Sequence, residues 1–174
     1  MTFQLPLAAP PVVTQEDHQC WSAAYESWSR ATAGVINGAT AMTESEIETT
    51  MARYPGAIAS NGGATLTGLG LFQVVGNMRL SSLPTDKLTY DFIEVALRTY
   101  GYLYLVFYAN GRNGLFSHAI VVYGRNNQGF MIMDPAAGRG LMTRPISYFL
   151  STTGMLLGVH ALAGPVGASL SKLD

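Results

Sequence analysis

The chain contains a single cysteine, Cys20, and its surroundings could make it a nucleophile. Apolar residues recur at helical spacing after it, which predicts a helix from Cys20 to about Ala33. At the first turn of a helix, unpaired N–H groups and the helix dipole favour an anion and so raise the thiolate fraction of a cysteine. Cysteine is also common as a small buried hydrophobe, so Cys20 alone does not establish a reaction.

A thiolate nucleophile needs a base, and that base needs a group to orient it. Of the three histidines, His160 lies in an apolar run typical of a core or edge histidine, and His18 lies in a polar loop typical of a solvated one. His118 stands near the start of an apolar strand, where a half-buried strand residue is the plain alternative to a base. We take His118 as the candidate base.

The carboxylate that would orient His118 is Asp134, at the end of the next predicted strand. A three-residue turn at Arg125–Asn127, with Gly124 opposite Gln128, would place His118 directly opposite Asp134, with Cβ atoms about 5 Å apart. A turn longer by one residue would send the two side chains to opposite faces of the sheet. Asp before Pro also commonly starts a turn, so this role depends on the register.

Acyl transfer also needs hydrogen-bond donors for the oxyanion that develops. The backbone N–H of Cys20 could supply one donor, and a side-chain amide shortly upstream could supply another. Both Gln15 and Gln19 are available. Gln15 is better placed, since a residue adjacent to the nucleophile usually points away from it.

The elements that must position these residues change character halfway along the chain. Helical patterns come first and strand patterns follow, which predicts a single α+β domain spanning residues 1–174, with its core at about 12–162. Helices are predicted at 20–33, 43–54, 65–77, 89–100 and 146–151, and strands at 102–108, 117–123, 130–134 and 155–162.

Composition excludes several classes of function. Hydrophobic residues make up 48% of the 174 residues and charged residues only 12%, so a disordered chain is excluded. The net charge is -1 without a basic cluster, which argues against binding to nucleic acid or to an anionic membrane. No metal or cofactor is expected, because His18 and Cys20 lack a second ligand cluster and no glycine-rich phosphate loop follows a strand.

The order of these residues resembles that of the papain-like cysteine peptidases: Gln, then Cys20-Trp21 at a helix start, then His118 in a strand, then Asp134. The segment 15–24 is similar to the compact bacterial branches, which include double-glycine leader peptidases and papain-like effector proteases. The run Asp134-Pro-Ala-Ala-Gly138 is similar to their Asp-Pro-Ala-x-Gly pattern. Gln15 lies one residue closer to the cysteine than is usual for that family, which leaves Gln19 as a second candidate.

The resemblance implies a papain-like fold and a thiol site with Cys20 as nucleophile, His118 as general base and acid, Asp134 as its orienting partner and Gln15 in the oxyanion hole. We therefore expect a cysteine endopeptidase that acts on a protein or peptide substrate. The low charge and the Pro-rich start suggest an excised toxin or effector domain of a larger secreted bacterial protein, acting in the cytoplasm of a target cell. An immunity or inhibitor protein would then be a partner.

Other functions stay open at this point. The same thiol chemistry would serve a leader peptidase, a cell-wall peptide amidase, a transferase or a deamidase. A non-enzymatic binding module with an unreactive, buried Cys20 is the remaining alternative.

Overall fold

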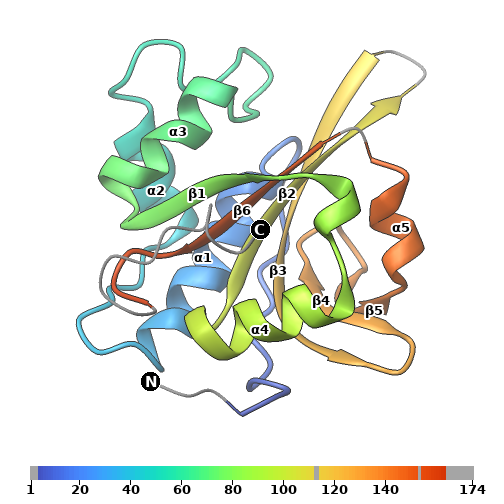
Figure 1. Ribbon diagram of the computed structural model, residues 1–174. Helices are drawn as coiled ribbons and strands as arrows, with labels where there is room; N and C mark the ends of the chain where they lie inside the picture. Colours follow the sequence, from blue (N-terminus) through green and yellow to red (C-terminus); the bar gives the residue numbers. More distant parts are fainter. Residues whose placement is uncertain (1–3, 112–113, 153, 164–174) are drawn as a thin grey trace.

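The computed structural model describes residues 4–111, 114–152 and 154–163 of the chain. Helices and strands follow one another in the expected order, with most helices before the sheet (Figure 1). The elements are α1 (Cys20–Ala33), α2 (Glu44–Met51), α3 (Leu66–Val75), β1 (Met78–Leu83), η1 (Thr85–Lys87), α4 (Tyr90–Tyr100), β2 (Leu103–Gly111), β3 (Gly114–Asn126), β4 (Gly129–Asp134), β5 (Gly140–Arg144), α5 (Ile146–Leu150) and β6 (Gly154–His160). No helix among the described residues is long and apolar enough to cross a bilayer.

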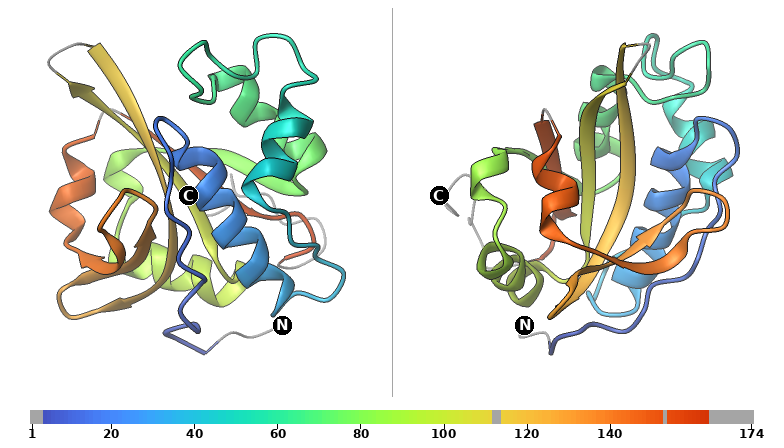
Figure 2. Two further views of the ribbon diagram at one scale, coloured as in Figure 1. Left: turned by 180° about the vertical axis from the view of Figure 1, so that it is seen from behind. Right: turned by 90° about the vertical axis from the view of Figure 1, so that its right-hand side faces the viewer.

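The six strands form one antiparallel sheet in the order β1-β6-β2-β3-β4-β5. Figure 2 shows the sheet edge-on, with α1, α2 and α3 on one side and α4 and α5 on the other. Three buried aromatic rings pack together on the α1 side: Tyr25, Phe72 and Tyr104. A second aromatic group, Phe107, Phe130 and Phe149, packs beneath α5. The sheet is therefore the middle layer of a three-layer α+β fold.

Side-chain caps set the starts of three helices. Thr43, Thr65 and Thr89 each accept a hydrogen bond from a backbone N–H in the first turn of α2, α3 and α4. The predicted helices are confirmed within a few residues. The second helix ends at Met51, before the expected stop at Tyr54. The third helix ends at Val75, because Gly76 and Asn77 follow it and Asn77 has a positive φ of 49°.

Two strands were not expected from the sequence. β1 and β5 are the two edges of the sheet, and each pairs with one neighbour only. β1 is half apolar, but its alternation stops after Leu80, and the two apolar residues of the five-residue β5, Leu141 and Met142, are adjacent. Their sequences therefore lack the alternation that marks a half-buried strand. The expected turn at 110–114 is also narrower than predicted, because β2 continues to Gly111 and β3 begins at Gly114.

The predicted register between β3 and β4 is wrong. Asn126 pairs with Gly129, so the turn has two residues instead of three, and His118 is not directly opposite Asp134. By itself, this turn would put the two side chains on opposite faces. A β-bulge between Val122 and Gly124 adds one residue to β3 and restores the common face, with the two residues in diagonal positions.

The N-terminal segment, residues 5–15, runs along the molecule and holds the bulge and α1 together. The N–H of Leu7 donates to the carbonyl of Tyr123 at the bulge (3.0 Å), and the hydroxyl of Tyr102 donates to Ala8 (2.8 Å). Further along, the hydroxyl of Ser27 on α1 donates to the carbonyl of Pro11 (2.6 Å). The segment therefore contacts α1 through Pro11, a few residues before the chain enters that helix at Cys20.

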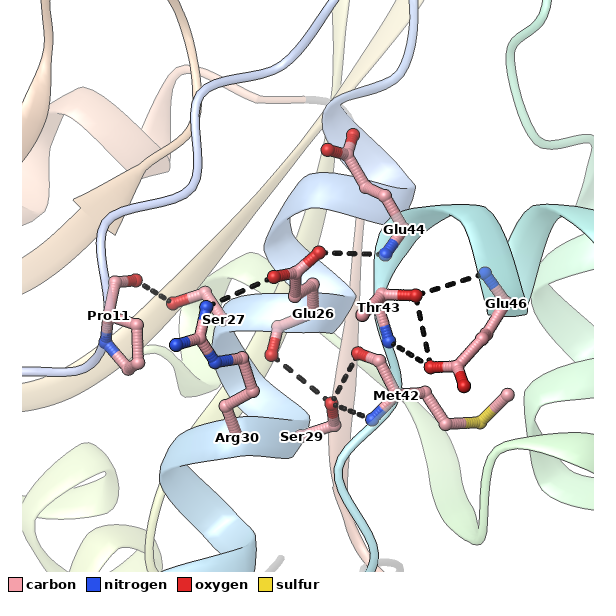
Figure 3. A network of polar contacts seen from close by, with 9 residues as sticks. All are labelled: Pro11, Glu26, Ser27, Ser29, Arg30, Met42, Thr43, Glu44 and Glu46. Atoms are coloured by element: carbon pink, nitrogen blue, oxygen red, sulfur yellow. Dashed lines mark hydrogen bonds and ion pairs between the residues drawn. The ribbon is translucent and has the colours of Figure 1, made fainter.

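A polar network fixes α1 against α2, as Figure 3 shows. Glu26 accepts a hydrogen bond from the backbone N–H of Glu44 at the start of α2 (2.8 Å), and the hydroxyl of Ser29 accepts one from Met42 (3.0 Å). Thr43 and Glu46 complete a capping box at the same helix start. These contacts give α1 a defined direction, which in turn fixes the position of its first residue.

Candidate active site

A cavity of about 610 Å³ brings together three of the four predicted site residues. Cys20, His118 and Gln15 all line it. Asp134 does not line the cavity and lies behind His118, with its side chain 2% exposed. The other lining residues come from the turn before α1, from α1 and α3, from the segment 59–65 and from β2 and β3: Asp17, His18, Trp21, Ala59, Asn61, Gly63, Ala64, Thr65, Leu69, Val106, Ser117 and Ala119.

Cys20 is the first residue of α1, as predicted, and is partly exposed. The N-cap residue Gln19 makes no side-chain hydrogen bond to the helix, and the first turn, all of it described, holds no acidic residue. Nothing in that turn therefore competes with a thiolate for the helix N-terminus. The hydroxyl of Tyr104 on β2 donates to the carbonyl of Trp21 (2.9 Å), which pins this end of the helix to the sheet.

His118 and Asp134 are in direct contact. Nε2 of His118 lies 2.7 Å from Oδ1 of Asp134, so the diagonal offset of the two strands is well within the reach of the side chains. Because Asp134 occupies Nε2, Nδ1 is the ring nitrogen left for the thiol of Cys20, which lines the same cavity and contributes to the raised pKa of the imidazole. The structure thus forms a chain of contacts from thiol to imidazole to carboxylate.

Electrostatics favour the charged form of both partners. Burial opposes the imidazolium, but the hydrogen bonds and charges of Asp134 and Cys20 outweigh it and raise the pKa of His118 to about 9. Burial likewise opposes the carboxylate, yet hydrogen bonds from His118, Ala136 and Arg139 lower the pKa of Asp134 to about 2. At neutral pH the pair is therefore an imidazolium held by a carboxylate.

Gln15 is held near Asp134 by the backbone. Its N–H donates to the carbonyl of Pro135 (2.8 Å), the residue that follows Asp134. The amide oxygen of Gln15 is buried and lacks a hydrogen-bond partner within the described part of the chain. Gln19 does not line the cavity and serves as the N-cap of α1. The geometry therefore favours Gln15 over Gln19 as the amide that meets a ligand.

The other two histidines lie outside this chain of contacts. His160 is buried, stacks on Trp28 with ring centroids 5.8 Å apart, and accepts a hydrogen bond from the N–H of Leu162, as expected of a core histidine. His18 is exposed, with a φ of 60°, and lines the cavity beside Cys20. Its left-handed conformation makes the tight turn that leads the chain into α1.

The segment 57–65 forms one side of the cavity, a role that was not predicted from the sequence. The indole N–H of Trp21 donates to the carbonyl of Gly62 (3.0 Å), which ties the segment to α1 directly after the cysteine. A bridge between Ile58 and Ala64 closes its base. Three successive residues, Asn61, Gly62 and Gly63, signal a loop, but no local pattern in the sequence indicates which element such a loop will face.

Sequence reasoning also missed Arg139. Its Nη1 lies 3.1 Å from Oδ2 of Asp134, on the opposite oxygen from the one that meets His118. The signal was present in the hairpin geometry, because Asp134 pairs with Gly140, the neighbour of Arg139. Among the described residues, no group of three or more His, Cys, Asp or Glu side chains is arranged to hold a metal ion.

Comparison with known proteins gives matches in structure alone. Neither models of protein families nor curated proteins match the chain. The peptidase domain of Streptococcus ComA, a bifunctional ABC transporter involved in a quorum-sensing pathway, superposes with a TM-score of 0.57 at 20% identity, covering 86% of this chain and 97% of that domain. A double-glycine-motif protease from an AMS/PCAT transporter, solved with the leader peptide, superposes with a TM-score of 0.56 at 16% identity, covering 90% and 94%.

These matches confirm the predicted fold class. The chain has the α+β papain-like fold, and the expected resemblance to double-glycine leader peptidases holds over most of its length. At such low identity the likeness concerns the fold alone, and the side chains of this chain determine its chemistry.

Proposed function

We propose that the chain is a papain-like cysteine peptidase in which Cys20, His118 and Asp134 act as the catalytic triad. One observation carries the proposal: an imidazole that is hydrogen-bonded to a buried carboxylate lines the same cavity of about 610 Å³ as the thiol at the start of α1. A base oriented by a third group and placed at a nucleophile is the arrangement that covalent catalysis requires. The papain-like fold supports the same assignment.

The reaction follows from the positions of the groups. The thiolate of Cys20 attacks the carbonyl carbon of the scissile bond, and the oxyanion is met by the N–H of Cys20 and the amide of Gln15. The imidazolium of His118 then gives its proton to the leaving amine as the C–N bond breaks. Water, deprotonated by His118, attacks the thioester, and the acid product leaves with the thiol restored.

The reactivity of Cys20 is the direct test, because the chain has no other cysteine and any alkylation must occur there. A free thiol is only about 3% ionised at pH 7, so a thiol paired with His118 should react with iodoacetamide about tenfold faster. His118→Ala should lose this advantage. His18→Asn is the matched control, since His18 is also close to Cys20. Slow alkylation of the folded parent, or no loss in His118→Ala, would sink the proposal.

Activity is tested on a mixture of peptides, with products identified by mass spectrometry. The parent should cleave internal peptide bonds and Cys20→Ala should cleave none. Cleavage of cell-wall peptides alone would favour the amidase reaction, and transfer of an acyl group to an added amine would favour a transferase. A reactive thiol that turns over none of these would contradict the peptidase proposal, and an unreactive thiol would favour the binding-module alternative.

A double-glycine leader peptidase is the second candidate. The observation that favours it is the fold match to the transporter-derived protease that was solved with the leader peptide. Two peptides that differ only in a Gly-Gly or an Ala-Ala pair before the scissile bond separate the candidates. A leader peptidase should reject Ala-Ala, because Cβ atoms do not enter a cleft built for two glycines, whereas a general endopeptidase should cleave both.

We further propose that the domain acts as a toxin or effector of a larger secreted bacterial protein, in the cytoplasm of a target cell. The low share of charged residues supports it, since a lightly charged surface suits a domain that is covered by other parts of a protein. Production of the parent inside bacteria should then arrest growth, and Cys20→Ala should not. An immunity protein would be found by its capture on the intact site from the host of origin. Harmless production of an active enzyme would contradict the role.

A further inference from the structure

We infer that Arg139 and Tyr148 are positioning residues for the His118–Asp134 pair, which they hold through a closed ring of side-chain contacts. The ring runs from His118 to Asp134, Arg139, Tyr148 and Phe107 and back to His118. It rests on the proposed function, because the pair that it holds is the proposed base and its orienting partner. None of the three additional residues lines the cavity.

The first link of the ring fixes the carboxylate. Oδ1 of Asp134 accepts from His118 (2.7 Å) and from the N–H of Ala136 (3.0 Å), while Oδ2 faces Nη1 of Arg139 (3.1 Å). The two oxygens therefore have separate partners, and a rotation of the carboxylate would break bonds at both. Since Asp134 is 2% exposed and Arg139 is 42% exposed, the guanidinium also lies between the carboxylate and water.

The second link joins Arg139 to α5. Asp134 and, to a smaller extent, the side chain of Tyr148 in that helix raise the pKa of the guanidinium, so Tyr148 lies close to Arg139. Tyr148 itself is held by Arg144, whose guanidinium carbon lies 4.8 Å from the centre of the ring. The guanidinium of Arg139 therefore lies between Asp134 and α5, although Arg139 comes from a loop.

The third link returns to the imidazole. The ring of Tyr148 meets Phe107 edge to face at 5.9 Å and 80°, and Phe107 meets His118 edge to face at 5.6 Å and 78°. Phe107 is also the residue directly opposite His118 in the β2–β3 pairing. The imidazole is thus held by a hydrogen bond on one side and by an aromatic edge on the other, which leaves few orientations of its ring.

The backbone explains how a loop residue reaches this position. β4 ends at Asp134 and β5 begins at Gly140, which pairs with Asp134. Between them, Gly138 adopts a φ of 76° and the N–H of Arg139 donates to Ala136 (3.0 Å), so the chain turns back at once. Arg139 therefore follows the Asp-Pro-Ala-x-Gly run directly and lies beside the residue that begins it.

The test compares Arg139→Gln and Arg139→Lys with Arg125→Gln. Arg125 is a matched control, since it also pairs with a carboxylate, Glu94, and its side chain is 36% exposed. The readout independent of activity is the NMR signal of the His118 Nε2–H proton, which a hydrogen bond to a buried carboxylate protects from exchange. We expect this signal in the parent, in Arg139→Lys and in Arg125→Gln, and its loss in Arg139→Gln.

The kinetic readout is the split between kcat and KM. Misplacement of the imidazole should lower kcat in Arg139→Gln about 10- to 100-fold with KM within about twofold, because only the reacting groups are disturbed. Tyr148→Phe, which keeps the ring and loses the hydroxyl, should show a smaller loss of the same kind. An unchanged proton signal in Arg139→Gln would overturn the inference, even if the parent proved not to be a peptidase. If the parent shows the signal but no peptidase activity, and Arg139→Gln loses the signal, the inference about Arg139 holds and the proposed function is wrong.

Discussion

His118 is the residue whose charge state matters most for the chemistry of the site. Its pKa is raised from 6.5 to about 9, so the imidazolium persists through neutral pH. A group with a raised pKa adds stability that is fully present below the unfolded pKa, near 6.5, and is lost as the pH rises toward 9. For Asp134, lowered from 3.8 to about 2, the stabilisation is present above about 3.8 and is lost as the pH falls toward 2.

A first prediction concerns Asp134→Asn. The variant keeps the size of the side chain and removes the charge, so His118 loses the group that raises its pKa. We expect the alkaline limit of kcat/KM to move from near pH 9 toward the ordinary histidine value. A rate profile of Asp134→Asn that coincides with the parent on its alkaline side would show that another group sets this limit.

The His118–Asp134 pair should also make the free energy of unfolding depend on pH. Removing one partner of a buried hydrogen-bonded pair costs about 1–3 kcal/mol, so Asp134→Ala should lower the free energy of unfolding by that amount at pH 6. The difference between parent and variant should shrink as the pH rises from 7 to 9.5, because the parent then loses its imidazolium. Urea denaturation at a series of pH values measures it. A difference that stays constant with pH would mean that the pair does not ionise as described.

At the scale of elements, two glycines of α3 differ in the space around them, and only one of them lies against the segment that lines the site. A Cβ on Gly68 of α3 would lie 2.1 Å from the carbonyl oxygen of Ala57, whereas a Cβ on Gly70 would meet nothing within 4 Å. Ala57 begins the segment that forms one side of the cavity, and Thr65 donates back to its carbonyl. The close approach of α3 to this segment therefore depends on Gly68.

A second pair of variants follows from this contrast. Gly68→Ala should destabilise the fold by about 2–3 kcal/mol and raise KM, because either α3 or the segment 57–65 must move. Gly70→Ala, exposed in the same helix, should stabilise it by about 0.5–1 kcal/mol with KM unchanged. Thermal unfolding and steady-state kinetics of both variants provide the measurement, and equal effects at the two positions would contradict the packing argument.

The elements also show how far the sequence could be interpreted. The start of α1 at Cys20 and the capped helices were predictable, because the residues that determine them are local. The contact between His118 and Asp134 was predicted with the wrong turn, and it forms because the bulge at Tyr123 offsets a shorter turn than expected. The role of Arg139 depends on the hairpin of β4 and β5, and β5 was not predicted. The role of the segment 57–65 depends on contacts between distant residues, which no pattern along the chain indicates.

At the scale of the whole molecule, the N-terminal segment connects the parts that must stay in register. Residues 5–15 touch the bulge through Leu7, α1 through Pro11, and the loop after Asp134 through Gln15. The nucleophile and its two partners thus come from α1, β3 and β4, and one extended segment contacts all three neighbourhoods. Loss of this segment should disturb the relative positions of α1, β3 and β4 more than the internal structure of any one of these elements.

Deletion of residues 1–9 tests this role. The deletion removes buried Leu7 and the hydrogen bonds at Tyr123 and Ala8, and we expect the Tm to fall by roughly 5–15 °C, with a loss of activity. Tyr102→Phe, which removes only the hydrogen bond to Ala8, should cost about 1 kcal/mol. An unchanged Tm after the deletion would show that the segment merely lies on the surface.

The bulge in β3 has a consequence for which lengths of hairpin the site tolerates. Tyr123 is the residue that the ladder leaves out, because Val122 pairs with Ile132 and Gly124 with Met131. A regular strand that paired Tyr123 would place His118 and Asp134 on opposite faces of the sheet. Deletion of Tyr123 removes the hydrogen bond from Leu7 but leaves every other pair of the ladder unchanged, so the His118–Asp134 contact and the reactivity of the thiol should survive it. Related chains can therefore lose the extra residue and keep the site, but a chain that pairs this residue within the ladder cannot.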